Sequence, residues 1–297
     1  MKIGLALGGG GARGLYHIGV LKALEKLKLK INCIAGTSMG SIIGGLYALY
    51  ADGDKVENII SRTLQKHRKV IDSFKIFSAP TSVESKKLFL EKSFEFVKNA
   101  YLWNLRIVKP YLVSPRPFFK ILKDLFSDRT FSDCKISFIA TAVEINTAKL
   151  VLLKSGYLWR AIAASSALSG FFAPVKLKGR ALVDGGTLVP LPAEVLKDEC
   201  DFIIGVSVEV SSVDPPFTNN AIDIMFTVDQ IRYKWIADRA MEEADFNIAP
   251  HIEGMDWPDF EKGWELVKRG EVETLARSDE LFKAIKRAKL RKYFFFK

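Results

Sequence analysis

The sequence predicts an α/β fold, a three-layer α/β/α domain with a mostly parallel central sheet and an inserted, mainly helical basic lobe. The first fifty residues alternate strand, glycine loop, helix, strand, sharp turn and helix, which is the opening of a parallel sheet. The alternation stops after Asp54 and resumes near Ile136, which leaves room for the insertion. With 297 residues, 48% of them hydrophobic, the chain can bury a full core. We therefore expect a single domain over residues 1–297.

The first two predicted strands each run into glycine. Residues 3–7 form a short apolar run that ends at four consecutive glycines, which is typical of a buried strand entering a tight loop. Residues 31–35 form a second apolar run, which ends at Gly36. Helices follow both runs, because residues 12–29 carry apolar side chains at amphipathic spacing and residues 42–51 are largely apolar.

The second half of the chain returns to this alternation. Short β-prone runs predict strands at residues 136–144, 149–153, 180–183, 201–210 and 246–249. Apolar periodicity predicts helices at residues 157–168 and 221–244 and a helical C-terminal segment over 259–297.

The net charge of +10 is concentrated in two segments. Residues 58–130 hold fifteen Lys and Arg against six Asp and Glu, and residues 281–297 hold seven against none. Both interleave these cations with aromatic side chains, which suits an anionic membrane and, on charge alone, nucleic acid. A solvated basic face over core aromatics explains the pattern equally well. We interpret 58–130 as a lid-like lobe and 259–297 as a helical basic tail, expect peripheral membrane contact through 58–130 and 281–297, and expect no nucleic-acid partner.

The cysteines and the N-terminus bear on the compartment. Cys33, Cys134 and Cys200 are too few and too scattered for a disulfide scaffold, and none is in a Cys-x-x-Cys pair. The apolar run at the N-terminus is too short for the core of a signal peptide, and no stretch approaches the roughly 20 apolar residues of a membrane span. We expect a soluble, cytoplasmic protein, peripheral on the membrane if it contacts one.

A candidate nucleophile stands in the turn after the second strand. Gly36-Thr37-Ser38-Met39-Gly40 fits the pattern G-x-S-x-G, in which a strand runs into a helix through a turn that only glycine tolerates on either side of the serine. Ser38 would stand exposed above the sheet at a helix N-terminus, where developing negative charge is stabilised. The alternative is a plain strand-to-helix turn.

The loop after the first strand is the second candidate element. Consecutive glycines let backbone N–H groups converge, which an oxyanion hole or an anion-binding nest requires. The candidate oxyanion-hole residues are Gly9, Gly10, Gly11, Arg13 and Gly14. The loop also fits the dinucleotide pattern G-x-G-x-x-G, but that site needs an acidic residue after the second strand, where the chain has Gly36. Nucleotide binding is therefore disfavoured.

A serine nucleophile needs a base, and Asp184 is the better candidate. It ends a predicted strand and is followed by Gly185 and Gly186, which open space around it. A carboxylate could take the serine proton directly if burial raised its pKa. The alternative base is His251, which would complete a Ser-Asp-His triad. His17 is expected to be a packed residue and His67 a solvated one.

Three motifs together resemble the patatin-like phospholipase family: Gly9-Gly10-Gly11-Ala12-Arg13-Gly14, Gly36-Thr37-Ser38-Met39-Gly40 and Asp184-Gly185-Gly186. The resemblance covers about residues 2–192 and is greatest to bacterial and archaeal members of the branch that includes the neuropathy target esterase domain. It implies a patatin-like fold and a Ser-Asp dyad without histidine, with Ser38 as nucleophile, Asp184 as proton acceptor and the glycine loop as oxyanion hole. Ser169 departs from the family pattern, in which a proline is expected before Gly170.

The expected function is hydrolysis of lipid acyl esters by a phospholipase A or lysophospholipase-like enzyme, with no metal and no organic cofactor. The nearest alternative is a soluble esterase or thioesterase with a Ser-Asp-His triad. A third is a membrane-binding or nucleic-acid-binding module without catalysis. The presence of Ser38, Asp184 and the glycine loop together argues against that third class, because a binding module does not need all of them.

Overall fold

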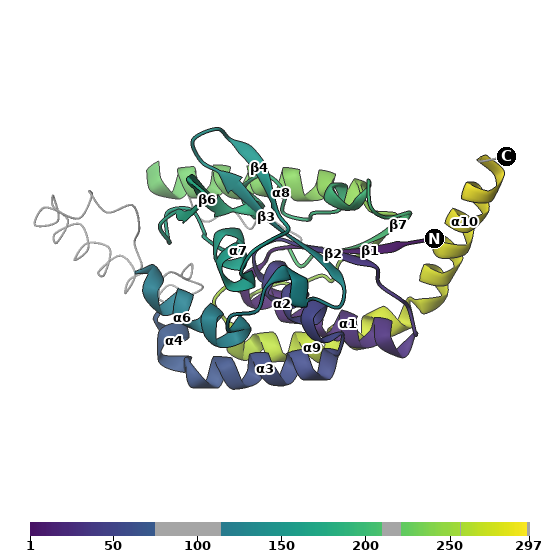
Figure 1. Cartoon of the computed structure of the whole chain (residues 1–297), viewed down its shortest axis with the longest axis horizontal. Helices are drawn as coiled ribbons and strands as arrows, with labels where there is room; N and C mark the ends of the chain where they lie inside the picture. The colour runs from purple at the N-terminus through teal and green to yellow at the C-terminus, as the bar shows by residue number, and fades with distance from the viewer. Residues whose placement is uncertain (75–113, 210–220, 256, 296–297) are drawn as a thin grey trace, which may run out of the picture.

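The computed structural model describes residues 1–74, 114–209, 221–255 and 257–295. A central sheet is flanked by helices on both faces (Figure 1), which confirms the predicted α/β class. Helices α1 (Tyr16–Lys26), α2 (Met39–Tyr50), α3 (Gly53–Lys66) and α9 (Phe260–Ala276) lie on one face, and α8 (Ala221–Glu242) lies on the other. The central part of the predicted lobe, residues 75–113, lies outside the described residues.

The sheet has the strand order β5-β6-β3-β2-β1-β7-β8, with β4 paired to β3. Five consecutive strands of this order, from β3 to β8, run parallel to one another: β1 (Ile3–Leu7), β2 (Cys33–Gly36), β3 (Ser137–Glu144), β7 (Phe202–Val206) and β8 (Phe246–Ile248). Three strands are antiparallel to their neighbours: β4 (Lys149–Leu153), β5 (Val175–Leu177) and β6 (Arg180–Asp184).

The pairing of β3 brings the ends of two other strands together. Strand β4 pairs with both Ala140 and Ala142, so it occupies one edge of β3 along this stretch. Ala140 also pairs with Gly36 at the end of β2, and Ala142 also pairs with Asp184 at the end of β6. Because a strand has only two edges, β2 and β6 share the edge opposite β4 and approach each other end to end.

Helices α1 and α9 pack closely because glycine stands at their crossing. A methyl group on Gly19 of α1 would collide with the carbonyl oxygen of Val267 and lie 2.6 Å from the backbone nitrogen of Glu271. A methyl group on Gly270 of α9 would collide with the carbonyl oxygen of Tyr16. The two helices therefore meet backbone to backbone, and no larger residue fits at either position.

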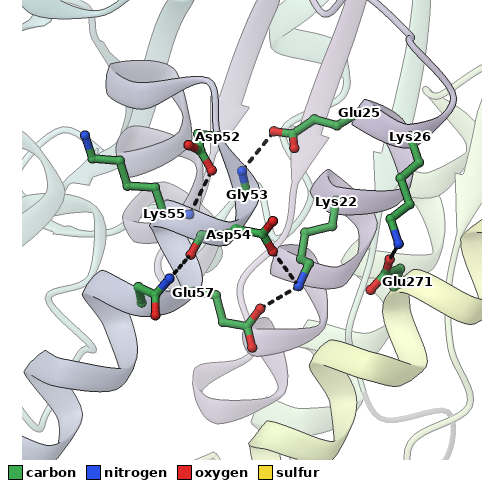
Figure 2. Close-up of polar contacts among 10 residues, drawn as sticks. Lys22, Glu25, Lys26, Asp52, Gly53, Asp54, Lys55, Glu57 and Glu271 are labelled. Atoms are coloured by element: carbon green, nitrogen blue, oxygen red, sulfur yellow. Dashed lines mark hydrogen bonds and ion pairs between the residues drawn. The ribbon is translucent and has the colours of Figure 1, made fainter.

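Charged side chains link α1 to its neighbours (Figure 2). Lys22 of α1 contacts Asp54 at 2.8 Å and Glu57 at 2.7 Å, both on α3. Lys26, one turn further along α1, pairs with Glu271 of α9. In each pair one side chain is largely covered and the other is more exposed, so the pairs add modest stability to the packing of α3 and α9 against α1.

The described ends of the predicted basic lobe are helices of the main core. They are α3, α4 (Arg68–Phe74) and α6 (Pro115–Phe126), and their apolar faces bury Ile60, Ile71, Leu122 and Phe126. His67, between α3 and α4, was expected to be solvated, and this is wrong. Its side chain is buried and its Nε2 lies 2.8 Å from the Asp124 carboxylate on α6, so it joins two helices instead of facing water.

The C-terminal segment forms two helices with different roles. Helix α9 packs into the core. Helix α10 (Ser278–Phe295) begins in the same core, where Leu281 and Ile285 are buried, and its C-terminal half then extends away from the body of the molecule (Figure 1). Lys292 of α10 pairs with Asp201, which directly precedes β7. This contact places α10 at the amino ends of the parallel strands. In the part of the chain that the structure describes, no helix has the length and apolarity needed to cross a bilayer.

Candidate active site

Ser38 occupies a strained turn between β2 and α2. Its backbone has φ 53° and ψ −121°, in a region that costs a residue with a side chain on the order of 1–3 kcal/mol. Glycine is required on both sides of it. A methyl group on Gly36 would lie 2.5 Å from the carbonyl oxygen of Gly40, and one on Gly40 would collide with that of Leu7. The turn therefore has the geometry of a nucleophile elbow.

The carboxylate of Asp184 faces this turn from the end of β6. It accepts a hydrogen bond of 2.7 Å from the Gly186 backbone N–H, and the Ser38 hydroxyl lies close enough to act on its pKa. Its side chain is buried, with 6% exposure. Burial, and to a lesser extent the nearby Glu209 carboxylate, raises the pKa of Asp184 to about 6, although the Gly186 N–H and the Ser38 hydroxyl both act to lower it. The structure thus joins Ser38 to a carboxylate with raised proton affinity.

Two threonines and a serine hold the two strand ends in place. The hydroxyls of Thr37 and Thr141 lie 2.7 Å apart, and Thr37 also donates to the Val189 carbonyl. Ser165, at the end of α7 (Leu158–Ser165), accepts the Ser38 backbone N–H at 3.1 Å. Sequence reasoning missed Thr37, Thr141 and Ser165 as supporting residues. Of these three residues, only Thr37 could have been suggested by the sequence, because it directly precedes Ser38.

The glycine loop lies beside the elbow. A methyl group on Gly9 would be 3.6 Å from the Ser38 Cβ. Gly10 and Gly11 have φ values of 134° and 58°, which favour glycine. Gly14 faces Met39, whose Cγ leaves no room for a larger residue, so Gly14 contributes close packing. As a residue within the 3-10 helix Gly11–Leu15, it uses its N–H in the hydrogen bonding of that helix.

Not every predicted oxyanion donor is available. The backbone N–H of Gly9 is donated to the Pro190 carbonyl at 3.0 Å, and that of Arg13 to the Gly10 carbonyl at 3.2 Å. Among the residues that the structure describes, the N–H groups of Gly10 and Gly11 have no acceptor. The expected set of N–H donors thus narrows to these two, because a group that already donates within the loop cannot serve an oxyanion.

One further N–H group beside Ser38 was not among the sequence-based candidates. The Met39 N–H directly follows Ser38 at the start of α2, and within the described ranges it has no acceptor either. In nucleophile elbows the residue after the nucleophile supplies an oxyanion N–H, so the G-x-S-x-G pattern itself could have indicated Met39.

Arg13 is held by a carboxylate that the motifs do not contain. Its Nη2 lies 3.5 Å from Glu209 Oε2, and its Nη1 donates to the Met255 carbonyl at 3.3 Å. The other oxygen of Glu209 accepts a 2.7 Å hydrogen bond from Tyr233 Oη on α8. Glu209 and Tyr233 come from segments with no catalytic motif, which is why sequence analysis missed them.

The histidines are not brought to the Ser38–Asp184 pair. His17 is buried, and its Nε2 donates to the Gly8 carbonyl at 2.9 Å, so it is a packed residue as expected. Burial lowers the pKa of His17 to about 4 although this hydrogen bond opposes the change. His251 has an exposed side chain and pairs with Glu253 at 2.8 Å. The partners of the Asp184 carboxylate are instead Gly186 and Ser38.

Comparison with known proteins identifies the class. The family model described as patatin-like phospholipase matches residues 5–197, which include every motif of the site. The chain belongs to the patatin-like phospholipase family. It is 33% identical over 198 residues to a patatin-like phospholipase domain-containing protein of Caenorhabditis elegans, covering 66% of this chain and 13% of that protein. It is 32% identical over 215 residues to lysophospholipase NTE1 of Cryptococcus neoformans, covering 72% of this chain and 11% of that protein.

These relatives are far longer than the chain, which spans little more than a tenth of their length. Among solved structures, human GIVD cytosolic phospholipase A2 in complex with a fluorophosphonate superposes with a TM-score of 0.50. The match covers 97% of this chain and 59% of that one at 12% identity, so the likeness is one of fold. It agrees with the predicted patatin-like architecture.

Proposed function

We propose that the protein hydrolyses acyl esters of lipids, with Ser38 as nucleophile and Asp184 as its general base. The observation that carries the proposal is the placement of the Ser38 hydroxyl beside a buried carboxylate whose pKa is raised to about 6. Such a carboxylate is ionised at neutral pH, yet it is a stronger base than an exposed aspartate. Family membership and the strained turn at Ser38 support the same assignment.

The proposed reaction has two halves. Ser38 Oγ attacks the ester carbonyl while its proton passes to Asp184, and the resulting oxyanion is stabilised by the N–H groups of Gly10, Gly11 and Met39. Collapse of this intermediate breaks the ester bond, and Asp184 returns the proton to the departing alcohol oxygen. In the second half Asp184 takes a proton from water, whose oxygen attacks the acyl-serine. The carboxylic acid product leaves, and Ser38 recovers its proton.

An apolar acyl chain is the substrate part that the surroundings favour. A cluster of aromatic side chains reaches the glycine loop through Trp257, and its other members are Phe74, Phe118, Phe171 and Phe172. The Trp257 carbonyl accepts the Ala12 N–H at 2.7 Å, which attaches this aromatic cluster to the loop. Phospholipids and lysophospholipids are the proposed substrate class, because the lysophospholipase NTE1 relatives bear that activity in their names. A soluble esterase or thioesterase is the competing proposal.

A peripheral membrane contact, with the protein in the cytoplasm, is part of this proposal. The basic helix α10 exposes Phe282, Leu290 and Tyr293, but it lies at the amino ends of the strands, whereas Ser38 follows the carboxyl end of β2. Helix α8 is better placed, because its Tyr233 reaches the site. Its outer face carries an exposed apolar row at helical spacing, formed by Ile224, Val228, Ile231 and Trp235. Such a row suits the interface of a bilayer.

The test compares vesicle and dissolved substrates. The purified chain is assayed, with a metal chelator present, on lysophosphatidylcholine, on phosphatidylcholine vesicles and on a dissolved short-chain ester and thioester. We expect hydrolysis of the lipids that Ser38→Ala abolishes and that Ser73→Ala, an exposed serine of α4, leaves intact. Activity that survives Ser38→Ala would refute the nucleophile, and turnover of dissolved esters alone would favour the soluble esterase.

A further inference from the structure

Glu209 lies between two side chains that frame the site. One of its oxygens accepts a 2.7 Å hydrogen bond from Tyr233 Oη, and the other lies 3.5 Å from Arg13 Nη2. The carboxylate is 17% exposed and the Arg13 side chain 11%. One neutral donor and one cation thus contact the two oxygens of this carboxylate, which offsets the cost of its partial burial.

The Tyr233 hydroxyl touches both loops of the Ser38–Asp184 pair. A methyl group on Gly9 would lie 3.3 Å from Tyr233 Oη, and one on Gly186 would lie 3.6 Å from it. The same Gly9 position is 3.6 Å from the Ser38 Cβ, and the same Gly186 position is 3.1 Å from Asp184 Oδ1. Tyr233 therefore packs against the backbone that positions the nucleophile and against the backbone that positions its base.

The charge of Glu209 affects the ionisation of Asp184. Within the described part of the chain, the groups that act on its carboxyl are Ser38 from the elbow, Gly186 from its own loop and Glu209, and Arg13 contacts Glu209 on its other oxygen. Tyr233 from α8 also faces Asp184, and its pKa lies well above the usual range because of burial and Glu209, so it remains a neutral phenol. Glu209 is thus the negative charge that opposes ionisation of Asp184.

We propose that Glu209 and Tyr233 are positioning residues of this site. Glu209 holds the Tyr233 hydroxyl and the Arg13 guanidinium against the two glycine loops, and its negative charge strengthens Asp184 as a base. The inference rests on the proposed function, since it assigns the environment of the same Ser38–Asp184 pair. No motif of the sequence contains either residue.

The charge is tested through the pH profile of kcat/KM on a dissolved ester, which reports the free enzyme. Glu209→Gln removes the charge, so Asp184 ionises more readily and the acidic limb of the profile moves to lower pH. The ratio of variant to wild-type kcat/KM is then expected to be at least about twofold higher at pH 5 than at pH 8. Glu209→Asp keeps the charge and should restore the wild-type limb.

Two further variants separate charge from packing. Tyr233→Phe keeps the ring and leaves Glu209 charged, so kcat/KM should fall while the acidic limb does not move to lower pH. Glu243→Gln, which removes an exposed carboxylate paired with Lys197 just after α8, is the matched control and should leave the profile unchanged.

The outcomes are distinguishable. If Glu209→Gln lowers kcat/KM by the same factor at every pH, the inference is overturned and the proposed function still stands. The same holds if the pH profile of Glu209→Asp matches that of Glu209→Gln. Wild-type hydrolysis that does not depend on Ser38 would instead overturn the proposed function. If Glu209→Gln does not fold, as judged by its thermal unfolding, Glu209→Asp and Tyr233→Phe decide the test. A shift of the acidic limb to lower pH in either of these two variants would overturn the inference.

Discussion

Ser38 and Asp184 meet because β2 and β6 approach end to end along one edge of β3. Gly36 pairs with Ala140 and Asp184 pairs with Ala142, two residues further along the same strand. A hydroxyl in the turn after β2 and a carboxylate at the end of β6 are thus brought close together by strand pairing. A dyad positioned in this way depends on rigid elements more than on loops.

Asp184→Asn should abolish turnover while the fold is retained. The amide oxygen of asparagine can still accept the Gly186 N–H, but the side chain cannot take the Ser38 proton. We expect kcat to fall by at least about a thousandfold, within the range of lost general-base catalysis. His251→Ala is the control and should keep full activity, because its exposed ring pairs with Glu253. The reverse pattern would restore the Ser-Asp-His triad.

The pKa of Asp184 also predicts how activity depends on pH. Because the base must be ionised, kcat/KM should rise with pH through about 6 and level off above pH 7. A profile that rises near pH 4 instead would show that the carboxylate behaves as an exposed aspartate.

The same carboxylate should lower stability at neutral pH. Its pKa is raised from 3.8 to about 6 on folding, so the folded state binds the proton more tightly than the unfolded state. Stability is therefore lost as the pH rises from about 4 to about 6. The full difference is on the order of 3 kcal/mol at pH 7. Asp184→Asn should therefore unfold at a higher temperature than the wild type at pH 8, and the advantage should disappear at pH 4. An equal difference at both pH values would contradict this origin.

The crossing of α1 and α9 predicts a stability change away from the site. Gly19→Ala places a methyl group against the backbone of α9, which cannot move aside as a flexible side chain would. We expect a loss of about 3 kcal/mol or more in the free energy of unfolding, measured by urea denaturation. Val272→Ala on the exposed side of α9 should change it by less than about 0.5 kcal/mol. Equal effects would contradict the close crossing.

The exposed row on α8 predicts a selective loss of activity on membranes. Ile231→Ser and Trp235→Ser remove apolar surface that makes no contact with the Ser38–Asp184 pair. Binding to anionic vesicles, measured by co-sedimentation, should weaken by about tenfold for the double variant, while hydrolysis of a dissolved ester should stay unchanged. Val272→Ser on α9 is the matched control, since that valine is equally exposed on the other face of the molecule. Unchanged vesicle binding would refute the membrane role of α8.

Sequence patterns predicted the strands that lead to Ser38 and Asp184 because both motifs combine an apolar run with glycine. The predicted strand over residues 201–210 is too long, since β7 ends at Val206. Beyond that point Val208 packs against Gly10, so its burial comes from contact with the glycine loop and not from the sheet. Strand β5 was missed, because three residues are too few to show a period of two.

The rest of the site could not be predicted, because it is assembled by tertiary contacts. Tyr233 lies on α8, whose exposed apolar side chains hide any amphipathic pattern that could point to it, and Glu209 follows β7 with no neighbouring motif. Likewise, which glycine N–H groups are free depends on acceptors far away in the sequence, such as the Pro190 carbonyl opposite Gly9. Only the three-dimensional arrangement decides these contacts.

Covalent capture of the nucleophile tests the central claim most directly. The wild type and Asp184→Asn are incubated with a long-chain alkyl fluorophosphonate, which forms a stable bond with an activated serine, and the modified peptide is identified by mass spectrometry. The account predicts one adduct, on Ser38, formed at least about a hundredfold more slowly in Asp184→Asn because the serine has lost its base. An adduct on another residue, or equal rates in the two proteins, would contradict the Ser38–Asp184 dyad.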